Sequence, residues 1–334
     1  MIILVIQVSW YRMAFYILRR LLNAVLVIWA AFTISFLLLY LLPSDPVSLM
    51  LSSDTGGGGS AVATSEQYAM LASRYGLDRP PLEQYGYLLA KAAAGDLGMS
   101  MQSGKTVITQ IGEALPETLK LAALSLAIAL VIGSTLALVA SYRQDGYLRA
   151  ILLALPPISM AVPTFWIGLV LLQIFAFELR LVPSLGNRGF SSLIMPALTL
   201  AIPAAATIAQ TLSKGLDDAA SQPFVRMLRA KGVPRRTIYL RHILHNASIP
   251  ALTVVGLLVG NIFAGAVVTE TVFSRVGIGR LLQNAVDVQD IPLVQGLVVL
   301  TAAAYAIVNL LVDLIYPLID PRIRRGVGAG GDAA

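Results

Sequence analysis

The stretch LAALSLAIALVIGSTLALVASY, residues Leu121–Tyr142, contains no charged residue. A helix needs about 20 mostly apolar residues to cross the hydrocarbon core of a bilayer. Five further uncharged stretches are long enough: Leu21–Leu42, Ile151–Phe177, Gly189–Ser213, Ala247–Thr269 and Ile291–Val312. Inside a bilayer each spanning backbone must satisfy its own hydrogen bonds, which a helix does. We therefore predict an all-α membrane protein with about six transmembrane helices.

The composition supports a membrane protein and excludes several kinds of chemistry. Hydrophobic residues make up 57% of the chain and charged residues 13%, with a mean hydropathy of +0.77. Soluble domains carry about 25% charged residues. The chain has no cysteine, so disulfides, thiolate metal sites and cysteine nucleophiles are excluded. The two histidines, His242 and His245, lie near no obvious third ligand, so we expect no metal site.

The charges between the apolar stretches predict an orientation. Six spans put both termini on one side of the membrane, together with the loops 143–150 and 214–241. These segments hold 15 basic and 5 acidic residues, whereas the rest of the chain holds 9 basic and 13 acidic residues. Cytoplasmic loops are enriched in Lys and Arg. We therefore expect both termini in the cytoplasm and read the net charge of +6 as a topology signal, with no nucleic-acid partner.

The spans and loops predict how the chain is organised. We expect these parts: an N-terminal extension (1–14), a first transmembrane helix (15–42), an extracytoplasmic cap segment (43–117), a core with five transmembrane helices (118–320) containing the cytoplasmic loop 214–245, and a cytoplasmic tail (321–334). Within the cap we predict helices over Ser65–Tyr75 and Leu82–Ala94, after a flexible Gly56–Ser60 linker. Either Met1 or Met13 can be the true start. Prolines within or near the spans predict kinks, namely Pro156, Pro157, Pro163 and Pro203.

The cytoplasmic loop contains a short amphipathic pattern. Phe224, Met227 and Leu228 have the i, i+3, i+4 spacing of one helix face. Gly232 suits the position just past a helix end, and Pro234 suits the start of another helix. Such a helix docks into a groove of a partner protein or lies flat on anionic lipid, and these residues alone leave both open.

The sequence Ser103–Thr106, SGKT, ends like a phosphate-binding loop. That motif requires a second glycine five residues before the glycine of the GK pair, where this chain has Met99. The predicted topology also puts it outside the cell, and we find no Ser/His/Asp arrangement for hydrolysis. We therefore expect no enzyme activity and no catalytic residue, with energy supplied by a partner or an ion gradient.

Three polar residues lie in or at the ends of predicted spans. Asp313 and Asn309 lie one turn apart in the last span, and a carboxylate at membrane depth is costly. Either a structural polar contact or a role in gating or proton movement fits them. Glu270, at the outer end of the fifth span, fits an interfacial position or an external gate.

Several blocks together resemble the permease subunits of dipeptide and oligopeptide ABC importers. They cover Phe15 to Arg324 and include YILRRL (Tyr16–Leu21), LPSDP (Leu42–Pro46), GLDRP (Gly76–Pro80), GDLG (Gly95–Gly98), LPET (Leu115–Thr118), FVR (Phe224–Arg226), RAKG (Arg229–Gly232), RHILHNA (Arg241–Ala247), ETVFS (Glu270–Ser274), GIGRLL (Gly277–Leu282) and DPRIR (Asp320–Arg324). The chain departs from the family pattern at Ser44, at Met227 and Leu228, and at Arg275 and Val276.

The resemblance implies a fold, partners and a site. It implies the type I ABC importer permease architecture in the bacterial cytoplasmic membrane. The partners would be a second homologous permease, two ATP-binding cassette subunits that carry ATP and Mg, an extracytoplasmic substrate-binding protein and membrane lipid. This chain would bind no cofactor itself and form half of a path for peptides or a similar small solute. The ATPase-coupling residues would be Phe224, Val225, Arg226, Met227, Leu228, Arg229, Ala230, Lys231 and Gly232. The rival hypothesis is an ion-coupled secondary transporter, although the sequence shows no inverted repeat.

Overall fold

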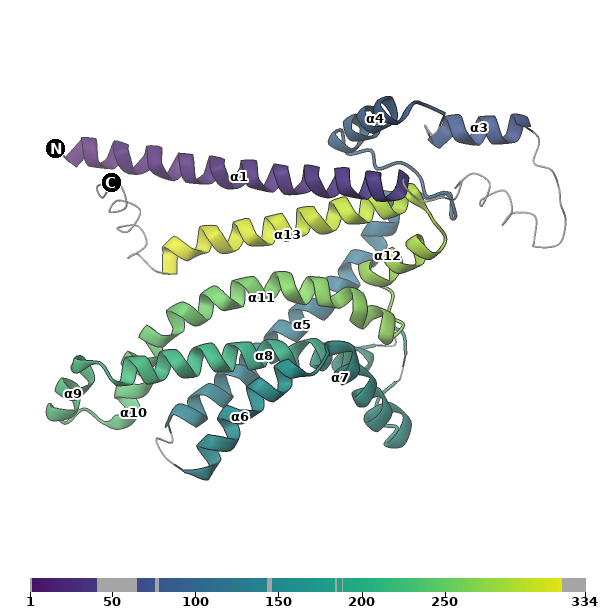
Figure 1. Ribbon diagram of the computed structural model, residues 1–334. Coiled ribbons are helices and arrows are strands. Elements are labelled where there is room, and N and C mark those ends of the chain that lie inside the picture. The colour runs from purple at the N-terminus through teal and green to yellow at the C-terminus, as the bar shows by residue number, and fades with distance from the viewer. Residues whose placement is uncertain are drawn as a thin grey trace. The chain divides into compact units, whose positions relative to one another are not determined.

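The computed structural model describes residues 2–40, 65–75, 78–142, 146–183, 185–187 and 189–319. Apart from turns and one isolated bridge between Met99 and Thr106, the regular structure in these ranges is helical. The helices, labelled in Figure 1, are α1 (Ile2–Tyr40), α3 (Ser65–Tyr75), α4 (Pro81–Ala93), α5 (Val107–Tyr142), α6 (Tyr147–Ala161), α7 (Thr164–Leu171), α8 (Ser191–Ala220), α9 (Pro223–Ala230), α10 (Arg235–Thr237), α11 (Leu244–Val272), α12 (Ile278–Asp287) and α13 (Ile291–Ile319). The π-helical segments η1 (Leu172–Glu178) and η2 (Ile238–Ile243) continue α7 and precede α11.

Within the described ranges, five stretches of helix are long and apolar enough to cross a membrane, and a bent pair makes a sixth candidate. The five are Leu18–Leu38, Val107–Tyr142, Ser191–Ala220, Arg235–Val272 and Ile291–Val308. Each overlaps one of the uncharged stretches identified in the sequence. The all-α membrane class is therefore confirmed among the described residues.

The remaining predicted span is broken into two helices. α6 and the α7–η1 segment meet at an angle of 104°. Val162 between them has an extended backbone (φ −93°, ψ 129°), and Pro163 lies at the N-cap of α7. Proline has no N–H and disfavours helical backbone in the residue before it, which explains why the helix ends here. By contrast, Pro156 lies inside α6 and Pro203 inside α8.

The described chain divides into two compact units. One comprises residues 1–116 and 281–307, and the other comprises residues 117–280 with the segment from 308 onward. The first part of α13 therefore packs with the N-terminal helices. The predicted linker 56–60 and tail 321–334 lie outside the described residues.

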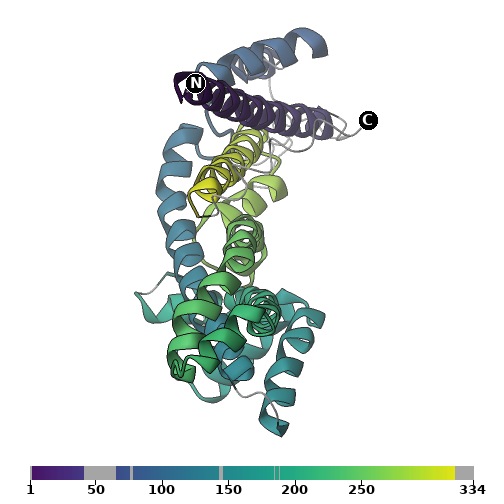
Figure 2. The same cartoon turned by 90° about the vertical axis from the view of Figure 1, so that its left-hand side faces the viewer.

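The core of the larger unit is built from small residues. α8 and α11 lie side by side in Figures 1 and 2. α8 is buried along most of its length, and many of its buried residues are alanines, such as Ala201 and Ala205. Gly133 of α5 has no room for a Cβ, which would lie 2.7 Å from the carbonyl oxygen of Ala205. Small residues let helix backbones approach closely, and this contact drives packing where lipid is as apolar as the side chains.

The smaller unit joins α4 and its following loop to α1 and α13. The predicted cap helices are present as α3 and α4. Asp290 precedes α13, accepts a hydrogen bond from the Leu293 backbone N–H and also binds Ser100 Oγ and the Met101 N–H. Thr33 of α1 and Tyr85 of α4 share a hydrogen bond of 2.8 Å between their hydroxyls. These contacts hold the segment before α5 on the ends of α1 and α13.

The SGKT sequence forms a tight exposed turn. Gly104 has a left-handed backbone (φ 65°), the Ser100 N–H donates to the Lys105 carbonyl, and Met99 and Thr106 form the bridge that closes the turn. The Lys105 ammonium lies 3.3 Å from the Glu113 carboxylate. The lysine is thus paired with a carboxylate of its own segment.

Candidate functional site

α9 and the turn after it form the first candidate site. Pro223 opens α9, where its missing N–H costs nothing. After Ala230 the chain turns at Gly232, whose left-handed backbone (φ 74°) lets the Val233 N–H donate to the Leu228 carbonyl at 3.1 Å. This is the glycine-ended helix that the sequence predicts. Pro234 then precedes α10, also as predicted.

The segment from α9 through η2 is fastened to the ends of α5 and α8. Arg235 donates to the Tyr142 carbonyl at 2.6 Å and lies over the Tyr142 ring, and the Tyr239 hydroxyl donates to the Ser141 carbonyl. Nearby, Arg149 and Asp217 form an ion pair at 2.8 Å, which joins α6 to α8. Contacts from several helices therefore fix the position of α9 within its unit.

The structure divides the predicted apolar face of α9. Val225 is 1% exposed, and Phe224 and Leu228 pack beside it against the cluster that includes Leu216 and Ile238. Met227 points away from this cluster and is 52% exposed. The one large apolar side chain that this helix leaves exposed to a partner is therefore Met227.

Cations surround the exposed methionine. Arg226, Arg229, Ala230 and Lys231 are all exposed. The sequence from Ala219 to Thr269 contains six basic residues and no acidic one. No ion pair within the described residues involves Arg226, Arg229 or Lys231. This surface, consisting of residues 226, 227 and 229–231, is called the α9 face below.

Glu270 lies in a second candidate site, a buried polar cluster at the other end of α8 and α11. Its side chain is 1% exposed, accepts the Thr118 hydroxyl at 2.6 Å and accepts the Gly279 N–H at 2.7 Å. A Cβ on Gly277 would overlap the Glu270 carboxylate, and a Cβ on Gly279 would overlap the backbone of Val267. The two glycines therefore let the chain after α11 fold closely around this carboxylate.

Arg275 completes this polar cluster, and sequence reasoning missed it as a functional residue. It is 3% exposed, lies 3.0 Å from a Glu117 carboxylate oxygen and donates to the Ser192 carbonyl and hydroxyl at 3.2 Å. Asn187 also donates to Glu117, at 2.9 Å. The cluster thus links α5, α8, α11 and the two loops beside them. The only sequence signal was that Arg275 departs from the family pattern.

Two of the predicted polar residues, Asn309 and Asp313, lie in α13. Their side chains fall outside the described part of the structure. Among the described residues, no group of three His, Cys, Asp or Glu side chains could hold a metal ion.

Comparison with known proteins identifies the family. Residues 108–325 match the model of the binding-protein-dependent transport system inner membrane component, and residues 13–122 match the N-terminal model of the same membrane component. The chain belongs to this family. It is a permease of the binding-protein-dependent ABC importers, a multi-pass protein of the bacterial inner membrane.

Individual relatives agree with this assignment. The permease is 34% identical over 320 residues to a probable peptide ABC transporter permease protein, y4tP, of Sinorhizobium fredii, covering 93% of this chain and all of the relative. It is 31% identical over 309 residues to the glutathione transport system permease protein GsiC of Escherichia coli, covering 92% of this chain and 98% of GsiC.

A solved structure supports the fold. The MetNI methionine ABC transporter in an inward-facing conformation aligns with a TM-score of 0.54 at 16% identity, over 63% of this permease and 96% of that chain. At this identity the likeness concerns the fold alone. The all-helical fold of an ABC importer permease, which the sequence resemblance implied, is therefore confirmed.

Proposed function

We propose that this permease forms half of the translocation path of an ATP-driven importer for peptides or a similar small solute. Its relatives include a probable peptide permease and a glutathione permease, and glutathione is itself a modified tripeptide. A second homologous permease supplies the other half of the path, and an extracytoplasmic binding protein delivers the solute. Family membership favours this function over the ion-coupled secondary transporter.

We further propose that the α9 face docks on the ATPase. The observation that carries this proposal is Met227, which is 52% exposed among cations that have no ion-pair partner in the described ranges, on a helix whose other face packs against its unit. Desolvating one such apolar side chain in a partner pocket is worth about 1.5–3 kcal/mol. This requires both termini and the α9 face to lie in the cytoplasm, as the basic residues predict. ATP and Mg are then held by two partner ATPase subunits, and this chain binds no cofactor.

The polar cluster suggests how docking acts at a distance. Glu270 and Arg275 tie together α5, α8 and α11, and α9 is fastened to the opposite ends of α5 and α8. Movement of the ATPase would therefore displace these helices as a body, which is the rigid rocking by which a partner biases two states. In this mechanism Glu270 and Arg275 position the external ends of the helices.

The experiment compares two exposed methionines. Met227→Asp puts a carboxylate in the proposed pocket, whereas Met70→Asp makes the same change on α3, where Met70 is 72% exposed. We expect Met227→Asp to abolish co-purification of the ATPase and ATP-driven uptake of a labelled tripeptide into proteoliposomes, and Met70→Asp to retain both. Normal ATPase co-purification with Met227→Asp would contradict the docking proposal. Uptake that survives ATP depletion and collapses with an ionophore would contradict the importer.

A further inference from the structure

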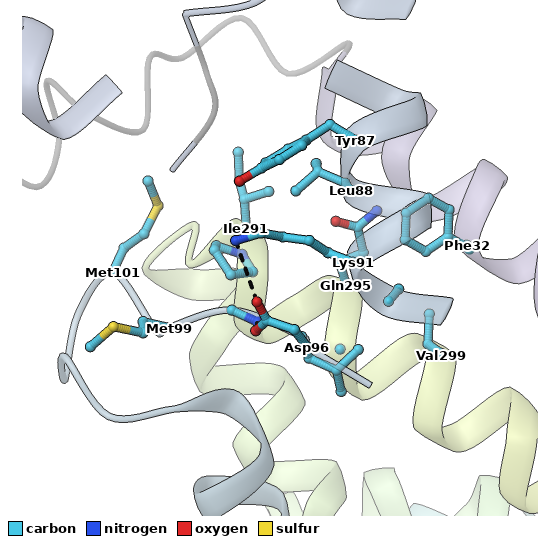
Figure 3. Close-up of a pocket in the computed structure, with 15 residues that line it drawn as sticks. Phe32, Tyr87, Leu88, Lys91, Asp96, Met99, Met101, Ile291, Gln295 and Val299 are labelled. Atoms are coloured by element: carbon cyan, nitrogen blue, oxygen red, sulfur yellow. Dashed lines mark hydrogen bonds and ion pairs between the residues drawn. The ribbon is translucent and has the colours of Figure 1, made fainter. Parts of the chain in front are cut away.

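The smaller unit contains a pocket of about 300 Å³ that the transport mechanism does not use. Figure 3 shows it between α4, the loop before α5 and the first turns of α13, with Phe32 of α1 on one side. Apolar side chains, including Phe32, Leu88 and Val299, form much of its wall. This volume is at the lower end of ordinary small-molecule sites.

A buried side-chain amide, that of Gln295, lines this pocket. Gln295 is 6% exposed, and its Nε2 finds no acceptor among the described residues. Leaving a buried donor without an acceptor is costly, and such groups are normally satisfied. A ligand that brings an acceptor oxygen to Gln295 would remove this cost.

The rim of the pocket carries one charge of each sign. The Lys91 ammonium lies 3.3 Å from Asp96 and 5.1 Å from the centre of the Tyr87 ring. Contact with Tyr87 raises the pKa of Lys91, and the Gly98 N–H lowers the pKa of Asp96, so both remain charged at neutral pH. Both side chains are partly exposed, at 39% and 57%, and can exchange partners. A neighbouring cation and carboxylate suit a zwitterionic headgroup better than a purely anionic one.

The position of the pocket indicates where such a ligand comes from. Phe32 belongs to the candidate span Leu18–Leu38, and Gln295 and Val299 belong to the span Ile291–Val308. The Thr33–Tyr85 hydrogen bond and the packing of Phe32 and Phe36 on Tyr85 hold α4 against α1 near the end of that span. Tyrosine is enriched at this depth, where apolar and polar surfaces meet. The most abundant amphiphile there is membrane lipid.

We propose that this pocket binds one zwitterionic phospholipid. Its ester or phosphate oxygens accept hydrogen bonds from Gln295 and Lys91, its ammonium faces Asp96, and part of an acyl chain lies along Phe32 and Val299. The remainder of the chain extends into the bilayer, since the pocket is too small for a whole lipid. The proposal is independent of docking on the ATPase and of the solute that is carried.

Native mass spectrometry tests this proposal. The sample is the purified importer, from which lipid is removed in successive steps. The probes are phosphatidylethanolamine, which has the ammonium, and phosphatidylglycerol, which lacks it. We expect wild type to retain one phosphatidylethanolamine in preference to phosphatidylglycerol. Gln295→Leu, which removes the donor at similar volume, should weaken retention by about two- to tenfold. Lys105→Met, which removes a lysine paired with Glu113 outside the pocket, should retain lipid as wild type does.

Three outcomes would overturn the proposal. Equal retention by wild type and Gln295→Leu would mean that the lipid binds elsewhere. Equal retention of the two lipids would mean that the charged rim does not select the headgroup. Loss of the bound lipid on addition of trialanine would mean that the pocket takes a peptide. If Gln295→Leu fails to assemble, Val299→Phe fills the pocket without removing a polar group, and it should also lose the lipid.

Discussion

The two ends of the larger unit use their charges in opposite ways. In the polar cluster, Arg275 and Glu270 are buried, and both are hydrogen-bonded to other groups of the chain. On the α9 face, Arg226, Arg229 and Lys231 are exposed and Met227 is 52% exposed. Charged groups that bind one another inside the unit hold its helices together. Charged groups that remain exposed are available to bind a partner.

The largest expected effect comes from Gly279→Ala. The new Cβ would overlap the Val267 backbone, which cannot move as a side chain can, so the loop would have to leave Glu270. We expect loss of folded permease, measured as monodisperse material in size-exclusion chromatography. Gly112→Ala is the matched control, because nothing lies within 4 Å of its Cβ in α5. A Gly279→Ala protein as stable as Gly112→Ala would refute the close packing of this loop.

The next effect separates two cations that contact the same carboxylate. Arg275 is 3.0 Å from Glu117 and buried, whereas Lys120 is 2.7 Å from it with a side chain that is 63% exposed. A hydrogen bond to a buried charged group such as Arg275 is worth about 1.5–3 kcal/mol, whereas an exposed ion pair is worth about 0–1 kcal/mol. Arg275→Met should therefore lower the thermal stability far more than Lys120→Met does. Equal decreases in melting temperature in the two variants would show that Arg275 stabilises the polar cluster no more than Lys120 does.

On α9 we expect smaller effects, with the buried Val225 affecting stability and the exposed Met227 affecting ATPase binding. Val225→Ala removes buried methyl groups and should destabilise the permease by about 1–3 kcal/mol. Met227→Ala removes exposed atoms and should change stability by no more than about 0.5 kcal/mol, yet weaken ATPase binding by about tenfold or more. Melting temperature and ATPase titration measure the two effects separately. If the Met227→Ala variant bound the ATPase with unchanged affinity, Met227 would not be part of the docking surface.

Much of the fold was predictable because long apolar runs permit few alternatives. The uncharged stretches located the membrane helices, and Gly232 and Pro234 located the turn after α9. The break at Val162–Pro163 was predicted only as a kink. The sequence does not give the size of a bend, because this depends on which helices the following segment packs against.

The sites were less predictable than the spans. An i, i+3, i+4 pattern finds an apolar face but cannot say which members face the chain itself, so Phe224, Leu228 and Met227 could not be separated. The Arg275–Glu117 contact joins residues 158 positions apart, and no local pattern marks such a pair. Glu270 was noted as a charge at a span end, but its burial depends on the loop that folds back at Gly277 and Gly279.

The absence of cysteine from the chain allows a direct measurement of the central claim, that the α9 face meets the ATPase in the cytoplasm. Met227→Cys introduces a single thiol, which a membrane-impermeant maleimide can label in right-side-out or inverted vesicles. We predict labelling in inverted vesicles only, and only after the ATPase has been stripped, with protection restored when the ATPase is added back. Labelling in intact right-side-out vesicles, or labelling unaffected by the ATPase, would contradict the account.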